Sequence, residues 1–266
     1  MIPPVVDAAW LQDHPHAVIA DVRWYLDGRS ARQVYESGHI PGAVFVDLDR
    51  DLAAPPSPAA GRHPLPAPQE FAAAMGRLGI ATGATVVAYD DAGGATAARL
   101  VWMLRVLGSE AALLDGGLAA YRGALEAGTV EPAPARFAVR DWPDGVLAGI
   151  EEASDPANVV IDARDPARYR GEQEPVDPRA GHIPGALNIP SRSNLGPDGR
   201  FLPAGELRER FVAAGAGPGV ISYCGSGVTA CHNLLALEHA GLGPGRLYPG
   251  SWSQYSSDPS RPAEVG

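Results

Sequence analysis

The residue with the clearest chemical potential is Cys224, which opens the glycine-rich segment Cys-Gly-Ser-Gly-Val-Thr at positions 224–229. A short apolar run over 219–223 precedes this segment, and a helical pattern over 229–240 follows it. The two glycines permit positive φ, so backbone N–H groups can turn inward beside a helix N-terminus, where negative charge is favoured. The segment therefore predicts a cysteine thiolate held in a cradle of backbone amides.

The same cysteine has two other interpretations. A buried cysteine often packs as a small apolar residue, but the glycines and the strand–loop–helix context count against that interpretation here. A cysteine phosphatase loop carries an arginine six positions after its cysteine, where it binds phosphate, and this chain has Ala230 at that position. Phosphate-ester chemistry is therefore disfavoured.

Composition restricts the class of protein. The chain has 266 residues, with 45% hydrophobic and 20% charged residues, as in soluble globular proteins. Its net charge of −10 argues against non-specific binding to nucleic acid. Two cysteines exclude a disulfide scaffold and a cysteine-based zinc site, and they favour a reducing cytoplasm. No signal-peptide pattern and no apolar run of about 20 residues is visible, so we expect no membrane association. We also expect a monomer.

The chain contains an internal duplication. Similar segments recur in the same order and at nearly constant offsets, which indicates a repeat and not chance. The matching segments are 17–23 with 158–164, 38–43 with 181–186, 85–90 with 219–224, and 114–118 with 248–252.

Each half of the duplication alternates short apolar strands with helical patterns. This alternation predicts two α/β domains, each with a mainly parallel sheet flanked by helices on both faces. Helices are predicted at 68–78, 95–107, 205–214 and 229–240. We expect a first domain at 1–122, a proline-rich linker at 123–149 and a second domain at 150–266, with another proline-rich stretch at 53–68 inside the first.

The loop at 224–229 and the repeated Gly-His-Ile-Pro-Gly-Ala motifs resemble the tandem-rhodanese sulfurtransferases, and the loop is most similar to that of the 3-mercaptopyruvate sulfurtransferases. The resemblance implies a transferase that moves sulfur from 3-mercaptopyruvate to a thiol, such as thioredoxin or a small thiol, or to cyanide. A persulfide on Cys224 would carry the sulfur, pyruvate would be released, and neither a metal nor an organic cofactor would be needed.

Two alternatives to a 3-mercaptopyruvate sulfurtransferase remain open: a thiosulfate sulfurtransferase and a non-catalytic relay module. Thiosulfate sulfurtransferases typically carry two basic residues where this chain has Gly225 and Ser226. Thiosulfate is a dianion that would benefit from those cations, so the loop favours 3-mercaptopyruvate as the donor. The second alternative, the relay module, would pass a persulfide to a partner without catalysing a reaction.

The resemblance also implies the residues of the site. The predicted substrate-binding residues comprise two arginines for the donor carboxylate and members of the loop: Arg168, Arg179, Gly225, Gly227, Val228 and Thr229. The predicted catalytic residues are Cys224 and a proton relay formed by Ser226, His63 and Asp49.

Several residues outside that set are expected to be structural. His39 and His182 sit in the repeated turn motif, and Arg164 has a counterpart, Arg23, in the other half. Asp90 occupies the position that matches Cys224, and a carboxylate cannot form a persulfide. The first domain is therefore predicted to be catalytically silent.

Overall fold

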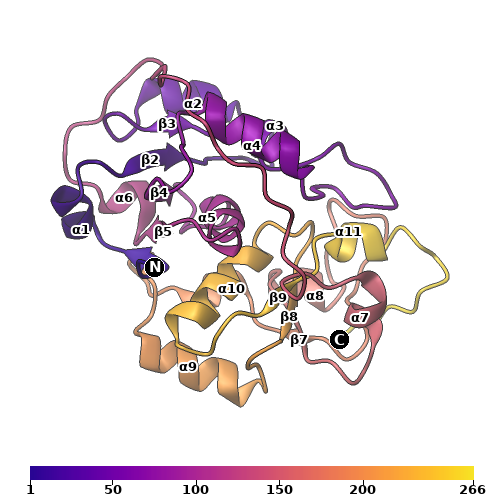
Figure 1. Ribbon diagram of the computed structural model, residues 1–266. Coiled ribbons are helices and arrows are strands. Elements are labelled where there is room, and N and C mark those ends of the chain that lie inside the picture. Colours follow the sequence, from indigo (N-terminus) through magenta and orange to yellow (C-terminus); the bar gives the residue numbers. More distant parts are fainter. The chain divides into compact units, whose positions relative to one another are not determined.

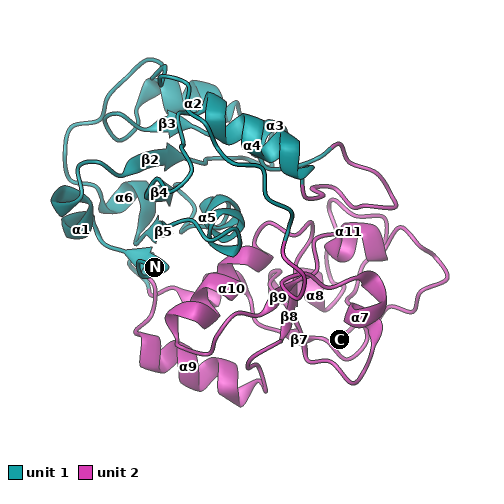
Figure 2. Ribbon diagram, viewed as in Figure 1, with its two compact units in different colours: residues 1–54, 66–142, 197–200 teal, residues 55–65, 143–196, 201–266 magenta.

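A computed structural model describes residues 1–266, which divide into two compact units (Figure 2). Unit 1 comprises residues 1–54, 66–142 and 197–200, and unit 2 comprises residues 55–65, 143–196 and 201–266. The predicted linker is thus shared between the units, and the segment 55–65 belongs to unit 2 although it lies early in the sequence. The predicted boundaries at 122 and 150 stay predictions.

Unit 1 contains a five-stranded sheet in the order β1-β5-β4-β2-β3, and every adjacent pair is parallel. Its strands are β1 (Val5–Val6), β2 (Val18–Asp21), β3 (Val44–Phe45), β4 (Val86–Tyr89) and β5 (Ala111–Leu114). Its helices are α1 (Ala8–Asp13), α2 (Ala31–Ser37), α3 (Leu48–Asp51), α4 (Pro68–Arg77), α5 (Ala97–Val106) and α6 (Gly117–Ala120). Helix α5 packs against β4 and β5 (Figure 1).

Unit 2 repeats this plan with a four-stranded parallel sheet in the order β7-β6-β8-β9. Its strands are β6 (Val160–Asp162), β7 (Leu187–Asn188), β8 (Ile221–Tyr223) and β9 (Arg246–Leu247). Its helices are α7 (Ile150–Ser154), α8 (Pro166–Tyr169), the 3-10 helix η1 (Ser191–Asn194), α9 (Ala204–Ala213), α10 (Ala230–His239) and α11 (Ser251–Tyr255). The predicted α/β fold with parallel sheets is confirmed.

Strand β8 is buried along its whole length in the core of unit 2, and its Ser222 hydroxyl donates to the Ala230 carbonyl at 3.1 Å. Strand β8 lies between β6 and β9, so both of its edges are paired, and all of its residues are buried, as is usual for a central parallel strand. Tyr223 and Trp252 are fully buried in the same cluster, and α10 packs across β8 and β9. The long predicted helices correspond to α4, α5, α9 and α10, with ends that differ by at most two residues.

A buried ion pair lies at the carboxyl end of β2 in unit 1 and of β6 in unit 2. Arg23 donates to Asp21 at 2.6 Å and to the Gly38 carbonyl at 2.8 Å. Arg164 forms the same two bonds in unit 2, to Asp162 at 2.6 Å and to the Gly181 carbonyl at 2.7 Å. Burial alone would lower the pKa of Arg164, but the attraction of Asp162 raises it above its usual value. The structural role expected for Arg164 is confirmed.

The histidines of the repeated turn motif are also structural. Nδ1 of His39 lies 2.9 Å from the carbonyl oxygen of Tyr35, and Nδ1 of His182 lies 2.8 Å from that of Tyr169. Each ring also stacks on the tyrosine that it contacts. Both histidines therefore hold the turn that leads into the next strand, as expected.

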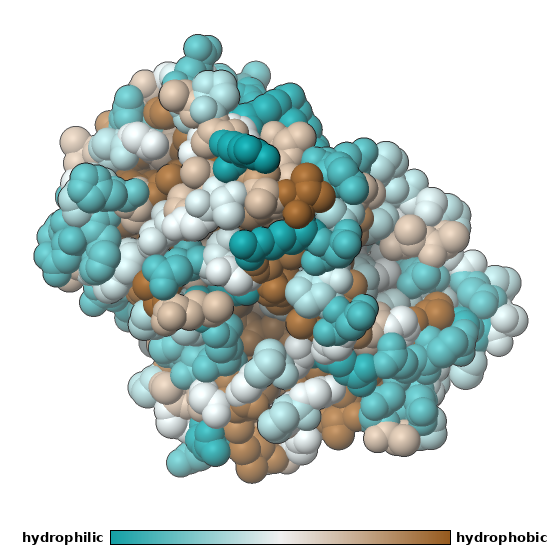
Figure 3. Space-filling model, in the orientation of Figure 1, coloured by the Kyte–Doolittle hydropathy of each residue, from teal (hydrophilic) through white to brown (hydrophobic).

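The polarity of the surface and the lengths of the helices are as expected for a chain with 45% hydrophobic and 20% charged residues. Hydrophilic and hydrophobic residues are interspersed on the face drawn in Figure 3. No helix combines the length and the hydrophobicity that a bilayer-spanning segment requires.

The buried pair predicts a large difference between two similar substitutions. Asp21→Asn leaves the Arg23 guanidinium buried without its counter-ion, so the free energy of unfolding should fall by about 3–5 kcal/mol. Asp27→Asn breaks an exposed pair with Arg29 and should leave the free energy of unfolding nearly unchanged. Urea unfolding of both variants, followed by circular dichroism, measures the two costs. Equal midpoints would contradict the structural importance of the buried pair.

Candidate active site

Cys224 lies at the carboxyl end of β8, between that strand and α10. This edge of a parallel α/β sheet is where such folds usually bind ligands. The side chain is 2% exposed, and neither Cys224 nor Cys231 forms a disulfide. The tyrosine before it, Tyr223, fixes the end of the strand because its hydroxyl accepts a hydrogen bond from the backbone of Ile183.

A backbone amide of the loop points at the cysteine sulfur. The Gly227 N–H donates to Cys224 Sγ over 3.1 Å. Gly227 has a φ of +78°, and a Cβ there would lie 2.6 Å from the Pro249 carbonyl oxygen. Only glycine fits this position. One backbone amide of the predicted cradle therefore points at the sulfur, while Gly225, unlike Gly227, does not adopt positive φ.

Helix α11 holds the other side of the loop. Its backbone amides at Trp252 and Ser253 donate to the carbonyls of Cys224 and Gly225 at 3.0 and 2.9 Å. The Ser251 hydroxyl accepts from the Cys224 N–H at 3.2 Å. Ser251 does this from a φ of +51°, and it is the one non-glycine residue with positive φ. Its unfavourable backbone is typical of residues that serve a site.

The corresponding loop of unit 1 contains an anion of its own. Asp90 accepts hydrogen bonds from four backbone N–H groups and one hydroxyl of the residues that follow it, at 2.8–3.1 Å. The donors are the amides of Ala92, Gly94, Thr96 and Ala97 and the hydroxyl of Thr96. This loop stabilises a fixed carboxylate where unit 2 has a sulfur, which agrees with the prediction that the first domain is silent.

Ser226 and His63 meet within unit 2. His63 Nδ1 lies 2.7 Å from Ser226 Oγ, and both side chains are buried. The segment that carries His63 is fastened to α11, since the Gln254 side chain donates to the Ala59 carbonyl at 2.6 Å. The sequence resemblance thus paired two residues that lie 163 positions apart in the chain and are hydrogen-bonded to each other; their role as a relay stays a prediction.

The third predicted relay member, Asp49, belongs to unit 1 and lies in α3. Its Oδ2 accepts a hydrogen bond from Trp24 Nε1 at 3.0 Å. The position of Asp49 behind His63 stays a prediction.

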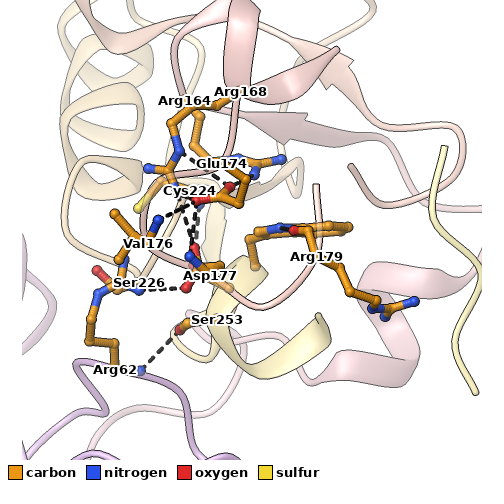
Figure 4. A network of polar contacts seen from close by, with 12 residues as sticks. Arg62, Arg164, Arg168, Glu174, Val176, Asp177, Arg179, Cys224, Ser226 and Ser253 are labelled. Atoms are coloured by element: carbon orange, nitrogen blue, oxygen red, sulfur yellow. Dashed lines mark hydrogen bonds and ion pairs between the residues drawn. The ribbon is translucent and has the colours of Figure 1, made fainter. Parts of the chain in front are cut away.

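Arg168 lies in α8 and is held by two buried carboxylates (Figure 4). Its Nη2 donates to Glu174 Oε1 at 2.6 Å and to Asp177 Oδ2 at 3.0 Å. Glu174 also accepts from the backbone amides of Val176 and Asp177, so it shapes the loop that bears both carboxylates. The guanidinium is therefore fixed before any substrate binds.

Arg62 joins the same network, although sequence reasoning did not single it out. Its Nη1 donates to Asp177 Oδ1 at 2.5 Å, so Asp177 binds one arginine with each oxygen. Burial raises the pKa of the Asp177 carboxyl above its usual value, against the lowering effect of Arg62. The only signal in the sequence was that Arg62 directly precedes His63.

Arg179 differs from its expected role as a substrate ligand. Its guanidinium donates to four backbone carbonyls near the end of α11 and beyond it, and it points away from Cys224 in Figure 4. The four acceptors are Tyr255, Ser256, Asp258 and Arg261. Because these donors are already used, Arg179 is a structural residue that closes the C-terminal end of α11.

The remaining predicted residues lie on the loop. Val228 is buried, and Thr229 is the residue before the first turn of α10. Their contact with substrate stays a prediction, as does that of Gly225 and Gly227. Cys231 Sγ donates to the Gly227 carbonyl at 3.4 Å, so the second cysteine supports the loop from within α10.

Comparison with known proteins agrees with this fold and site. A family model described as a rhodanese-like domain matches residues 7–124 and again 146–258. The chain therefore belongs to the rhodanese-like family and contains two copies of the domain.

Individual relatives are more specific. A Pseudomonas aeruginosa protein provisionally named a 3-mercaptopyruvate sulfurtransferase is 46% identical over 95% of this chain and 93% of its own length. A Mycobacterium tuberculosis protein provisionally named a thiosulfate sulfurtransferase is 42% identical over 97% and 94%. The crystal structure of Escherichia coli SseA, described as a 3-mercaptopyruvate sulfotransferase, matches with a TM-score of 0.82. That match has 36% identity and covers 94% of this chain and 99% of SseA.

Proposed function

We propose that this chain is a 3-mercaptopyruvate sulfurtransferase that carries sulfane sulfur as a persulfide on Cys224. The observation that supports this proposal most directly is the Gly227 N–H aimed at Cys224 Sγ from a loop that permits no side chain at 227. A preorganised amide stabilises negative charge on sulfur in both the thiolate and the persulfide. The named functions of the relatives agree with this chemistry.

The first half-reaction transfers the donor's sulfur atom. The Cys224 thiolate attacks the thiol sulfur of 3-mercaptopyruvate, and an S–S bond forms while the donor's C–S bond breaks. The electron pair of the C–S bond moves to carbon and gives the pyruvate enolate, which takes one proton to become pyruvate. Covalent catalysis of this kind divides one difficult transfer into two easier steps.

The proton for the enolate can come from Ser226. Its hydroxyl is 2.7 Å from His63 Nδ1, so the histidine can return a proton to the serine as it is used. In this proposal Asp49 orients the imidazole, as the acid does in other relays of three residues.

The second half-reaction regenerates the enzyme. A thiolate acceptor, on thioredoxin or on a small thiol, attacks the outer sulfur and leaves with it, and the electron pair of the S–S bond returns to Cys224. Cyanide can act as acceptor in the same way. The free state of both cysteines suits a cytoplasmic setting, and we propose a cytoplasmic monomer.

Thiosulfate is the second candidate donor, because the Mycobacterium tuberculosis relative carries that name. The loop itself has no cation, yet Arg62 and Arg168 lie beside it. The absence of basic residues within the loop is therefore a weaker argument against thiosulfate than the sequence suggested. A direct comparison of donors decides between the two functions.

Cys224 should be the only residue that carries sulfur. Incubation with 3-mercaptopyruvate should add about 32 Da, one sulfur atom, and peptide mapping should place it on Cys224. Cys224→Ser should abolish both the adduct and turnover. Cys231→Ser is the matched control and should keep both, since a serine hydroxyl can still donate to the Gly227 carbonyl. An adduct on Cys231 alone would contradict the proposal.

The donor preference should favour 3-mercaptopyruvate. We expect its kcat/KM to exceed that of thiosulfate by at least about 10-fold, because two planar guanidiniums suit a carboxylate. Steady-state kinetics of the unmodified protein with both donors and one thiol acceptor measure this ratio. A higher kcat/KM with thiosulfate would reassign the protein to the second candidate function, and turnover with neither donor would favour the relay module.

His63→Ala should separate proton delivery from thiol reactivity. Loss of a general acid typically costs at least 100-fold, so kcat with 3-mercaptopyruvate should fall by about that factor. Alkylation of Cys224 by iodoacetamide should keep its rate, since the Gly227 amide remains. His16→Ala, at an exposed histidine, is the control and should change neither. Loss of alkylation together with turnover would instead assign His63 to maintenance of the loop.

A further inference from the structure

We infer that Arg62 is a substrate-binding residue that forms, together with Arg168, a two-guanidinium clamp for the carboxylate of the sulfur donor. This inference rests on the proposed function and adds to it a second arginine for the donor carboxylate, the role for which the sequence predicted Arg179. All of the residues involved belong to unit 2.

The first evidence is the direction of the two guanidiniums. A Cβ built on Gly225 would lie 3.1 Å from Arg62 Nη2 and 3.3 Å from Arg168 Nη1. Both arginines therefore approach the backbone next to Cys224 with nitrogens that bind neither of the acidic partners. Both guanidiniums thus lie within contact distance of a side chain at position 225.

The second evidence is the way in which Asp177 couples the arginines. Its two oxygens bind Arg62 Nη1 and Arg168 Nη2, at 2.5 and 3.0 Å, and its side chain is only 2% exposed. A carboxylate that accepts from both guanidiniums fixes the spacing between them. The pair is thus arranged in advance for an anion, which avoids much of the entropy cost of ordering long side chains upon binding.

The third evidence is a buried donor without an acceptor. Arg62 Nε is shielded from solvent and has no hydrogen-bond partner. Buried donors are nearly always paired, and those left over require an explanation. A donor carboxylate held by Arg62 would supply one.

The backbone around Arg62 is firmly held, so the clamp does not depend on a mobile loop. The Arg62 N–H donates to Ser253 Oγ at 3.0 Å, and a Cβ on Gly61 would lie 2.5 Å from the Gly250 carbonyl oxygen. The next residue, His63, is bonded to Ser226. One short segment would therefore contribute both a carboxylate ligand and the proton relay.

Arg179 cannot supply the second guanidinium, because backbone carbonyls occupy it. A 2-oxo acid places its carboxylate one carbon from its carbonyl and two from the carbon that bears sulfur. A clamp beside Gly225 would then set the sulfur close to Cys224. The clamp should therefore act on donors with this carboxylate and not on donors that lack it.

The test compares two donors on the full-length chain. 3-Mercaptopyruvate carries the carboxylate, and mercaptoacetone presents the same thiol and ketone without it. Arg62→Gln should reduce kcat/KM for 3-mercaptopyruvate about 10- to 100-fold, mostly through KM, and change that for mercaptoacetone less than about 2-fold. Arg168→Gln should show the same selectivity. Arg29→Gln, at an exposed pair in unit 1, should affect neither donor.

Substitution by lysine provides a second variant. Arg62→Lys keeps the charge and the backbone bond to Ser253 but cannot form a planar fork, so it should recover only part of the loss. An equal loss with both donors, or unchanged kinetics in Arg62→Gln, would overturn the clamp.

A binding assay keeps this result separate from the proposed function. Pyruvate should protect Cys224 from iodoacetamide, and half-protection should require about 10-fold more pyruvate in Arg62→Gln. If the wild-type protein forms no persulfide, yet half-protection still requires about 10-fold more pyruvate in Arg62→Gln than in the wild type, the clamp stands and the proposed function fails. If persulfide forms normally and protection does not change in Arg62→Gln, the clamp fails and the proposed function stands.

Discussion

The cradle of the Cys224 loop is the constraint on which the rest of unit 2 depends. A loop that aims an amide at sulfur must direct carbonyls elsewhere, and buried carbonyls need donors. Helix α11 supplies these donors through the amides of Trp252 and Ser253. Ser251 adopts a positive φ, and its hydroxyl accepts a hydrogen bond from the Cys224 N–H. Arg179 then closes the far end of α11. The stabilisation of the sulfur is thus supported by an element that makes no contact with substrate in the proposed mechanism.

Charge around the loop is balanced before any donor binds. Arg62 and Arg168 are matched by Glu174 and Asp177, and Asp162 matches Arg164. This pairing keeps the guanidiniums in place, because a buried cation without a partner is costly. The nitrogens left over define where a further anion can bind. A network of this kind suits recognition of a carboxylate better than a lone arginine, since the orientation of each planar fork is already fixed.

The duplication provides an internal comparison of what one residue changes. Both halves share the buried Asp–Arg pair, the histidine turn and a loop of inward amides at the end of a central strand. At Asp90 the loop closes on a permanent carboxylate with five donors, which leaves it no capacity for sulfur chemistry. At Cys224 the side chain has two heavy atoms fewer and ends in a thiol. The same backbone arrangement therefore stabilises a structural anion in one half and a proposed reactive one in the other.

The sequence by itself determined the α/β class and the duplication, because these follow from local periodicity and from matching segments. It marked Cys224 as the candidate nucleophile and Asp90 as its counterpart in the other half. It also indicated Ser226 and His63 through family resemblance. Tertiary structure decided which arginines face the site. Arg62, Arg168 and Arg179 look alike in sequence. Asp177 binds both Arg168, nine positions away, and Arg62, 115 positions away, whereas carbonyls 76–82 positions further along the chain occupy Arg179. A guanidinium's role is set by the acceptors that fold around it, and no local pattern records those acceptors.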